Sequence, residues 1–511
     1  MNQSIRALSA TAAVLTLSLV LSGCSALFST SAAPTESTPT GENVDSSLDS
    51  FYSQVLQWED CDGGLQCSEA MAPLDYADPA AGDVSLALVR QVATGNDRIG
   101  SLLVNPGGPG ASGYDFVKDS LDYATDEKLQ ASFDIVGFDP RGVGRSSAVS
   151  CYDSADMDEY LYGLATAERG TDAWIAELAE SSDAFAAACA EQTGALLGTV
   201  DTQSAARDLD LLRAVLGDTE LNYLGYSYGT FLGATYAELF PEKVGRLVLD
   251  GAVDPSTSNF EVTKTQAVGF ENALRAYLAD CVAGDDCPFR GSVDSAMTTI
   301  GALMGSVDAS PITATDGRQL GANALLIAII YPLYTATGWP QLSAMFDTVL
   351  HGSADAAFQF ADAYNGRDAE GNYTDNSTES FMAINCIDYS YNADPTNMRA
   401  QAAELAAAAP VIGPYMSFGD IACANWPEKF TGERTEIHAA GAAPILVVGT
   451  TNDPATPYVW AQSLAEQLDS GSLVTYTGEG HTAYNKSNSC VNDAVDSYLL
   501  DGTVPAADPQ C

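Results

Sequence analysis

The stretch Leu221–Thr230 contains a serine in a setting that could make it a nucleophile. Ser227 is the centre of Gly-Tyr-Ser-Tyr-Gly, a G-x-S-x-G pattern, between an apolar run typical of a strand and a run typical of a helix (231–237). A serine on such a strand-to-helix turn is exposed at the end of a sheet, above a helix N-terminus. The pattern also occurs by chance in ordinary turns. In this context it predicts that Ser227 is the nucleophile of a hydrolase.

A serine hydroxyl needs a base to remove its proton, and His481 is the candidate. The base is usually a histidine whose tautomer is fixed by a carboxylate. The chain has 3 histidines, and only His481 directly follows a predicted strand, in Gly-Glu-Gly-His-Thr. His351 and His438 lie in or beside a long predicted insertion, so we interpret them as surface or packing residues.

The candidate carboxylate is Asp453, which follows the preceding predicted strand. It is the only acid in Thr-Thr-Asn-Asp-Pro-Ala-Thr-Pro (450–457), a loop that two prolines stiffen. An aspartate in such a loop often caps a turn. The order Ser227, Asp453, His481 along the chain, however, is the order expected of a catalytic triad at the edge of such a sheet. Thr456 is a candidate to brace this loop.

An oxyanion formed at the substrate carbonyl would need backbone N–H donors. The residue after the nucleophile, Tyr228, supplies one. The other is expected from the loop after an early strand, Asn-Pro-Gly-Gly-Pro-Gly (105–110), whose paired glycines allow close approach to a substrate. Gly108 is the preferred donor and Gly107 the alternative.

The elements that must position these residues alternate between strands and helices. Near-continuous apolar runs are typical of parallel strands covered on both faces. The predicted strands are 84–89, 99–105, 133–139, 221–225, 244–250, 444–449 and 472–476. The sequence therefore predicts an α/β fold with a mostly parallel sheet.

The order of these segments predicts how the domains are divided. We expect a signal peptide at 1–24, a Ser/Thr/Ala/Pro-rich flexible tether at 25–50, and the first part of the core at 51–254. A mainly helical cap (255–435) interrupts the sheet, and the core ends with 436–511. Open α/β sheets bind ligands at the carboxyl ends of their strands, where the cap is expected. A smaller insertion spans 151–200.

The N-terminus has the features of an export signal. Arg6 precedes an apolar stretch (7–20) that is too short to span a bilayer comfortably, and Leu-Ser-Gly-Cys follows. The last four residues resemble a bacterial lipobox, which predicts that Cys24 is lipid-modified. A plain secretory peptide with an incidental cysteine is the alternative. We expect an exported protein held at the outer face of the membrane by its lipid alone, or released from it.

Charge and cysteine content agree with an extracytoplasmic protein. The 511 residues carry a formal net charge of −47, which disfavours nucleic acid as a partner. Without Cys24, 10 cysteines remain, an even number that indicates disulfides. Connectivity is not fixed by sequence, but proximity along the chain favours Cys61–Cys67, Cys151–Cys189, Cys281–Cys287, Cys386–Cys423 and Cys490–Cys511. The histidines and cysteine spacing offer little basis for a metal site.

From residue 58 to the C-terminus the sequence resembles α/β-hydrolases of the prolyl-iminopeptidase type, and more closely the actinobacterial secreted tripeptidyl aminopeptidases. The matching pieces are 105–110, Asp-Pro-Arg-Gly-Val-Gly-Arg-Ser (139–146), the turn at Ser227, 453–457 and Gly480-His481. The resemblance implies an α/β-hydrolase core with a helical cap, no cofactor, and removal of short peptides from free N-termini. Iminopeptidases have histidine before the paired glycines. Asn105-Pro106 here argues against proline specificity and suits the tripeptidyl branch.

The sequence thus predicts a serine peptidase that releases short peptides, with tripeptides expected, through an acyl-enzyme. An esterase, a lipase or another small-molecule acyl hydrolase is the first alternative, because many functions share this scaffold. A non-catalytic binding lipoprotein is the second. Binding a free N-terminus requires a group for the ammonium, usually a carboxylate, and Asp388 in the cap is one suggestion. The oligomeric state is not determined.

Overall fold

The computed structural model describes residues 35–430, 432 and 434–511. The predicted signal peptide, its lipobox and Cys24 therefore lie outside the described residues. The strands are β1 (Thr35–Glu36), β2 (Gln57–Asp60), β3 (Gln66–Pro73), β4 (Asp83–Gln91), β5 (Gly100–Asn105), β6 (Phe133–Phe138), β7 (Leu221–Tyr226), β8 (Val244–Asp250), β9 (Ile312–Thr313), β10 (Gln319–Leu320), β11 (Ile445–Asn452) and β12 (Gly471–Glu479).

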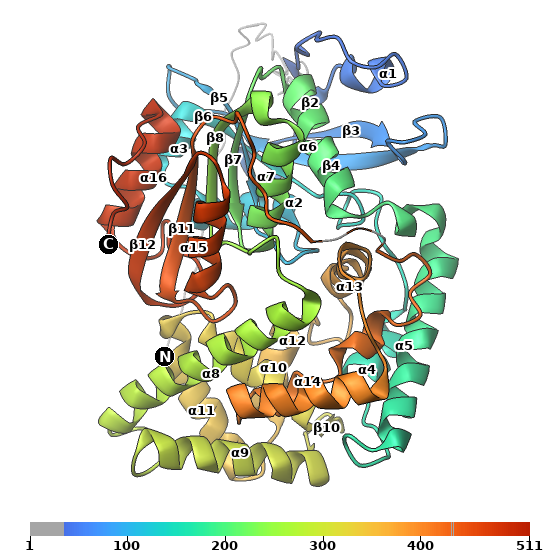
Figure 1. Ribbon diagram of the computed structural model, residues 1–511, viewed down its shortest axis with the longest axis vertical. Helices are drawn as coiled ribbons and strands as arrows, with labels where there is room; N and C mark the ends of the chain where they lie inside the picture. The colour runs from blue at the N-terminus through green and yellow to red at the C-terminus, as the bar shows by residue number, and fades with distance from the viewer. Residues whose placement is uncertain (1–34, 431, 433) are drawn as a thin grey trace, which may run out of the picture. The chain divides into compact units, whose positions relative to one another are not determined.

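Ten of these strands form one sheet, in the order β1-β2-β3-β4-β6-β5-β7-β8-β11-β12 (Figure 1). The six strands from β6 to β12 in this order are mutually parallel, whereas β1–β4 pair antiparallel with one another and β4 pairs antiparallel with β6. Every residue of β5 and of β6 is buried, as expected of strands covered on both faces. The prediction of an α/β fold with a mostly parallel sheet is confirmed.

Helices cover both faces of this sheet. The α-helices are α1 (Asp49–Tyr52), α2 (Gly113–Ala124), α3 (Glu127–Ser132), α4 (Ser154–Tyr162), α5 (Asp172–Thr193), α6 (Thr202–Leu216), α7 (Tyr228–Leu239), α8 (Asn259–Ala283), α9 (Val293–Ala309), α10 (Ala322–Leu333), α11 (Trp339–Leu350), α12 (Asp355–Tyr364), α13 (Ser377–Asp388), α14 (Pro395–Ala408), α15 (Tyr458–Gln467) and α16 (Ser489–Asp501). Short 3₁₀ helices are η1 (Asp62–Gly64), η2 (Gly194–Gly198), η3 (Pro241–Lys243), η4 (Ala336–Gly338), η5 (Gly413–Tyr415) and η6 (Gly419–Cys423).

Two apolar cores follow from the alternation of side chains along the strands. On β7 and β8, Tyr223 and Leu249 belong to the core that includes residues of α6, α7 and α15, whereas Leu224 and Val248 belong to the core with α2, α3 and α16. Successive side chains point to opposite faces of a sheet, so both helix layers bury apolar residues against the same strands.

The register brings the carboxyl ends of the parallel strands to one edge. Asn105 pairs with Gly225 in the neighbouring strand, and Tyr226 pairs with Asp250. Asp250 in turn pairs with Val448 of β11, and Asn452 with Glu479 of β12. The loops after β5, β7, β8, β11 and β12 therefore meet at this edge. They include Gly108, Ser227, Asp453 and His481, and Tyr228 is the first residue of the helix after β7.

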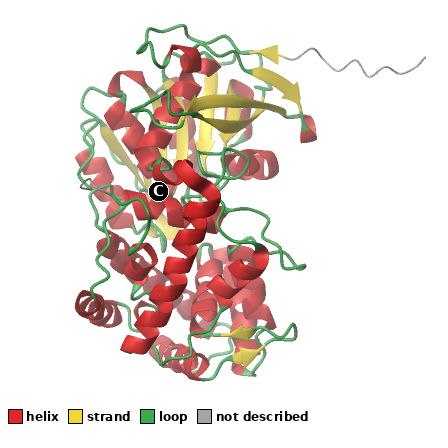
Figure 2. Ribbon diagram, turned by 90° about the vertical axis from the view of Figure 1, so that its right-hand side faces the viewer, coloured by secondary structure: helices red, strands yellow, loops and turns green. Residues whose placement is uncertain are grey.

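Most of the helices between β8 and β11 form an apolar core of their own, whereas α13 contributes to the core that includes α6 and α7. The separate core is built mainly from α8 to α12, with residues in and after α14 and with Tyr162 from the smaller insertion. Figure 1 shows these helices beyond one end of the sheet, and Figure 2 shows the region to be almost entirely helical apart from the hairpin β9–β10. None of the described helices is long and apolar enough to cross a membrane. All five disulfide pairings favoured from the sequence are present.

The structure differs from the predicted flexible tether over residues 35–50. β1 pairs with β2, and the backbone N–H of Thr40 donates to the carbonyl of Ala214. Glu42 forms ion pairs of 2.7 Å with Arg213 and 3.0 Å with Lys243. The polar composition suggested a tether. The partners of Thr40 and Glu42, however, lie more than a hundred residues further along the chain, where no local pattern reveals them.

Candidate active site

Ser227 lies on a strained turn between β7 and α7. Its backbone has φ 56° and ψ −126°, a conformation that is costly for a residue with a side chain. A Cβ at Gly225 would come within 2.4 Å of the Gly229 carbonyl, and one at Gly229 within 2.8 Å of the Asn105 side chain. The two glycines of the G-x-S-x-G pattern are therefore required by close packing. This is the geometry of a nucleophile elbow.

The glycine-rich loop after β5 lies against the start of α7. A Cβ on Gly107, which has φ +98°, would be 2.9 Å from the backbone nitrogen of Tyr228. The N–H of Gly107 donates to the Asn105 side chain at 2.9 Å. The N–H groups of Gly108 and Tyr228, by contrast, make no hydrogen bond to any other described residue. Of the two glycines considered, only Gly108 therefore has an N–H free to donate.

Asp453 and His481 form a buried hydrogen-bonded pair. Nδ1 of His481 is 2.9 Å from both carboxylate oxygens of Asp453. The His481 side chain is 12% exposed and the Asp453 side chain 0% exposed. Asp453 also accepts hydrogen bonds from the backbone N–H groups of Ala455, Thr456 and Thr482, at 2.8–3.1 Å. A carboxylate facing Nδ1 keeps the proton on that nitrogen, which leaves Nε2 as the basic atom.

The end of β8 brings Ser227 and His481 into one neighbourhood. The N–H of Ser227 donates to the carbonyl of Asp250 at 3.0 Å, and a Cβ on Gly251 would be 3.2 Å from Cε1 of His481. Among the described residues, neither Ser227 Oγ nor His481 Nε2 has a hydrogen-bond partner. Both reactive atoms are thus free to engage a substrate, and such bonds often form only in its complex.

Three further residues support His481. The hydroxyl of Thr456 donates to Asp453 at 3.0 Å and lies 3.2 Å from Nδ1 of His481. Asp250 is fully buried, which raises the pKa of its carboxyl, and it accepts the N–H of Ala483 at 3.0 Å. The carbonyl of Tyr334, at the end of α10, accepts the N–H of His481 at 2.8 Å.

Sequence reasoning raised Thr456 but missed the other two. Asp250 is the last residue of a predicted strand, at the same sheet edge as the other candidates, and that position was a usable signal. Tyr334 ends an apolar run that reads as buried helix, so nothing local links it to a histidine 147 residues further on.

Asp388 does not have the role suggested for it. Its two oxygens accept hydrogen bonds from the backbone N–H of Thr202 at 3.0 Å and from the Thr202 hydroxyl at 2.5 Å, and the residue is only 7% exposed. The Thr202 hydroxyl is also 2.5 Å from the hydroxyl of Tyr228. Burial raises the pKa of Asp388 to about 7. Asp388 thus ties α13 to α6 and to the residue after Ser227, and is not a free carboxylate for an ammonium group.

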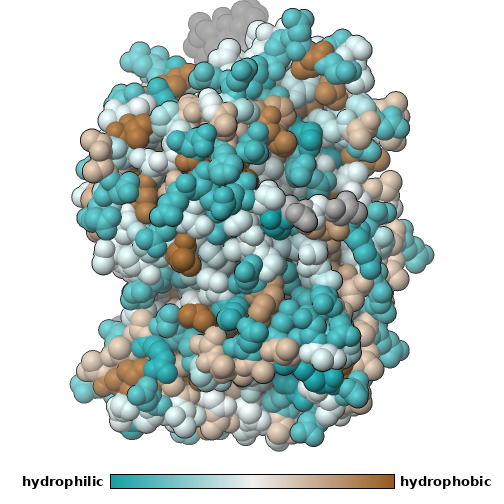
Figure 3. All heavy atoms as spheres, viewed as in Figure 1, coloured by the Kyte–Doolittle hydropathy of each residue, from teal (hydrophilic) through white to brown (hydrophobic). Residues whose placement is uncertain are grey.

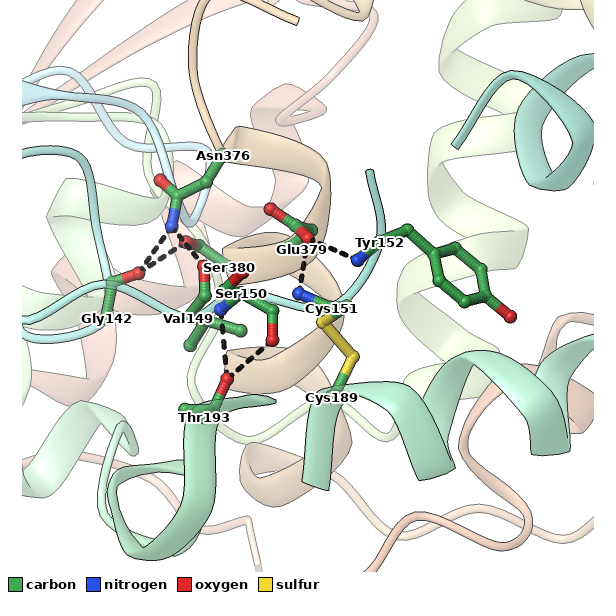
Figure 4. The surroundings of a disulfide bond; sticks show 10 residues. All are labelled: Gly142, Val149, Ser150, Cys151, Tyr152, Cys189, Thr193, Asn376, Glu379 and Ser380. Carbon is green, nitrogen blue, oxygen red and sulfur yellow. Dashed lines mark hydrogen bonds between the residues drawn. A yellow bond between two sulfur atoms is a disulfide. The ribbon is translucent and has the colours of Figure 1, made fainter. Parts of the chain in front are cut away.

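The other end of α13 is tied to the loop that follows β6, beside the disulfide Cys151–Cys189 (Figure 4). Asn376 donates to the carbonyls of Gly142 and Val149 at 2.9 and 2.8 Å. Glu379 accepts the N–H of Cys151 at 2.6 Å. A Cβ on Gly110 would be 2.9 Å from the backbone nitrogen of Phe381 in α13. These contacts hold α13 against the loop that contains Gly108.

The Asp-x-Arg-Gly-x-Gly-x-Ser stretch supports this framework. Asp139 is fully buried and accepts hydrogen bonds from the Ser112 hydroxyl at 2.5 Å and from the N–H of Arg145 at 2.8 Å. Arg141 is also fully buried and is paired with Asp208. His351 and His438, as expected, have exposed side chains (76% and 55%).

Comparison with known proteins identifies the family of this chain. Residues 409–511 match the family described as "TAP-like protein". The chain is 36% identical to serine protease Hip1 of Mycobacterium tuberculosis, over 90% of this chain and 91% of that protein. It is 35% identical to carboxylesterase B of M. tuberculosis, over 87% and 86%. It is 32% identical to tripeptidyl aminopeptidase of Streptomyces lividans, over 89% and 86%. The chain belongs to the TAP-like family of α/β-hydrolases.

Proposed function

We propose that this protein is a serine peptidase that releases short peptides, with tripeptides expected, from the free N-termini of its substrates. The observation that carries the proposal is the convergence of Ser227, on its strained turn, with the Asp453–His481 pair and the free N–H groups of Gly108 and Tyr228. Relatives named serine protease and tripeptidyl aminopeptidase support peptide substrates.

In the proposed mechanism Ser227 Oγ attacks the scissile carbonyl carbon while Nε2 of His481 takes its proton. The N–H groups of Gly108 and Tyr228 stabilise the oxyanion of the tetrahedral intermediate. The C–N bond then breaks, and His481 gives the proton to the leaving amine. Water, deprotonated by His481, hydrolyses the acyl-enzyme and returns the hydroxyl to Ser227. Asp453 keeps the imidazole oriented and stabilises its charged form.

A second candidate function is hydrolysis of carboxylic esters. The same residues would perform it, and a relative named carboxylesterase B is nearly as similar as the serine protease. Fold and site alone do not separate these activities. A non-catalytic binding protein is disfavoured, because such a protein would have no need of the strained Ser227 or of the Asp453–His481 pair.

A single assay set separates these possibilities. The purified protein is incubated with a chromogenic tripeptide amide that has a free amine, with its N-acetylated twin, and with a short-chain ester. Cleavage of the free-amine peptide alone is the expected result. Ester hydrolysis with both peptides intact would reject the peptidase proposal. Labelling by a serine-reactive phosphonate, lost in Ser227→Ala, tests the nucleophile independently.

We also propose that the protein is exported and lipid-anchored through Cys24. Its five disulfides are typical of proteins that fold outside the cytoplasm. In an actinobacterial host fed an alkyne-bearing fatty acid, the wild-type protein should be labelled and fractionate with membranes. The Cys24→Ala variant should be neither labelled nor retained, and equal labelling of both would reject this anchor.

A further inference from the structure

Three tyrosines form a continuous aromatic surface that begins at the candidate catalytic histidine. The ring of Tyr334 is edge-on to the ring of His481, with centroids 5.4 Å apart at 86°. Tyr364, the last residue of α12, is 6.4 Å from Tyr334 between ring centroids. Tyr331, in the last turn of α10, is 6.3 Å from Tyr364. We call these three residues the tyrosine shelf.

The shelf is both fixed and accessible. Behind it, Tyr334 packs on Phe270 of α8, and Tyr331 packs on Phe360 of α12. Tyr331 and Tyr364 are nevertheless 40% and 42% exposed, although most large apolar side chains of the described residues are buried. Exposed aromatic rings that adjoin reactive groups are typical of a ligand site.

The position of the shelf identifies the part of a substrate that would contact it. In the proposed reaction Nε2 of His481 gives its proton to the leaving amine, so the residue after the scissile bond must lie against His481. The acyl part instead extends from the oxyanion donor Gly108. The helix that contacts that loop is α13, where the backbone nitrogen of Phe381 would be 2.9 Å from a Cβ on Gly110, and the Phe381 side chain is exposed. The shelf therefore lies on the leaving-group side.

We propose that the tyrosine shelf binds the side chain of the first residue of the leaving peptide and favours aromatic or large apolar residues there. This inference rests on the proposed peptidase function. Burial raises the pKa of the Tyr334 and Tyr364 hydroxyls, so these two residues offer no charge to attract acidic or basic side chains. Offset or edge-on stacking of an aromatic substrate residue adds to the gain from its buried area.

The test uses peptides with a free amine, Ala-Ala-Ala-X-amide, in which X is Phe, Leu, Gly or Asp. Release of X-amide is followed by mass spectrometry, and kcat/KM is compared within the series. We expect Phe to exceed Gly by about tenfold or more, since one apolar group in a pocket discriminates by about 10–200-fold. Tyr364→Ala should reduce this ratio to about twofold or less, and Tyr364→Phe should retain it.

Phe381→Ala is the matched control, because it truncates an aromatic side chain of similar exposure on α13, the helix whose backbone contacts the loop that contains Gly108. It should leave the Phe/Gly ratio unchanged. A wild-type ratio near one, or a ratio that survives both Tyr364→Ala and Tyr331→Ala, would overturn the inference. The inference would also be overturned if Tyr364→Ala changed the preference for the residue before the scissile bond, measured against the wild type with an Ala-Ala-X-Gly-amide series. If the wild type cleaves no peptide but hydrolyses the ester, the peptidase proposal itself fails.

Discussion

Replacing Arg141 should destabilise the protein more than any substitution of an exposed charge. The side chain is fully buried, and its Nε and Nη2 donate to the two oxygens of Asp208, each at 2.7 Å. Its remaining N–H groups donate to the carbonyls of Pro73, Leu74 and Thr199, each at 3.0 Å. One guanidinium thus joins the end of β3, the loop before α6, and α6 itself.

In Arg141→Met the Asp208 carboxylate stays buried without its cation. Breaking a buried ion pair in this way costs about 3–5 kcal/mol. Three carbonyls also lose a donor, so we expect a loss at or above the upper end of that range. This is a large part of a typical unfolding free energy of about 5–15 kcal/mol. The further change Asp208→Leu removes the stranded charge, so the double variant should recover about 2 kcal/mol or more.

Urea titrations followed by tryptophan fluorescence, with the disulfides intact, measure these differences. Arg145→Met is the control, because Arg145 belongs to the same stretch but is 44% exposed and pairs with the half-exposed Asp115. Surface pairs contribute about 0–1 kcal/mol. If Arg141→Met were no less stable than Arg145→Met, or if Asp208→Leu made the single variant worse, the reasoning would be refuted.

Three other changes test the site. Asp453→Asn should lower kcat by about 10³–10⁴-fold with little loss of stability, because the amide disfavours the His481 tautomer needed for catalysis. Single-turnover kinetics measures this effect, and a loss below tenfold would contradict the prediction. Gly107→Ala should lower kcat at least as far as removing one oxyanion donor, about 10²–10³-fold, because its Cβ would be 2.9 Å from the Tyr228 nitrogen; retained activity in a folded variant would falsify this. Burial raises the pKa of Asp388 from its ordinary value of 3.8 to about 7, so its contribution to stability is fully present below pH 4 and is lost as the pH rises through 7. Asp388→Asn should therefore flatten the pH dependence of unfolding between pH 4 and 8, by up to about 4 kcal/mol, and parallel curves for the two proteins would argue against the buried carboxyl.

The surface of the molecule is consistent with its charge. On the face shown in Figure 3, hydrophilic residues predominate and hydrophobic ones are scattered singly or in small groups. Isolated apolar residues are normal on a protein surface. The tyrosine shelf differs from them, since three rings are contiguous and adjoin His481.

Local sequence determined the strands of the parallel sheet. The apolar runs of β5, β6, β7, β8 and β11 are long because both faces of these strands are largely buried. The predicted positions match β4 to β8, β11 and β12 within a few residues. The antiparallel strands β2 and β3 were missed. They lie near one edge of the sheet, are partly exposed and contain charged residues, so their composition resembles that of a loop.

Sequence also determined which residues could do chemistry. The G-x-S-x-G turn, the paired glycines and the strand-end positions of Asp453 and His481 are local patterns that a parallel sheet brings to one edge. The pairing of cysteines that are close to one another in the sequence correctly predicted the five disulfides that are present.

Tertiary structure alone decided how these groups are held. The Asn105 side chain accepts the N–H of Gly107, which leaves Gly108 as the glycine with a free N–H. Only the direction of the Asn105 side chain decides this. The sequence suggested Asp388 as a ligand for an ammonium group, but its oxygens accept hydrogen bonds from Thr202, which is 186 residues away in the chain. Tyr334 supports His481 only because α10 ends beside the loop after β12. Such contacts join residues with no local relation, so they follow from the packing of the whole chain and not from any pattern within it.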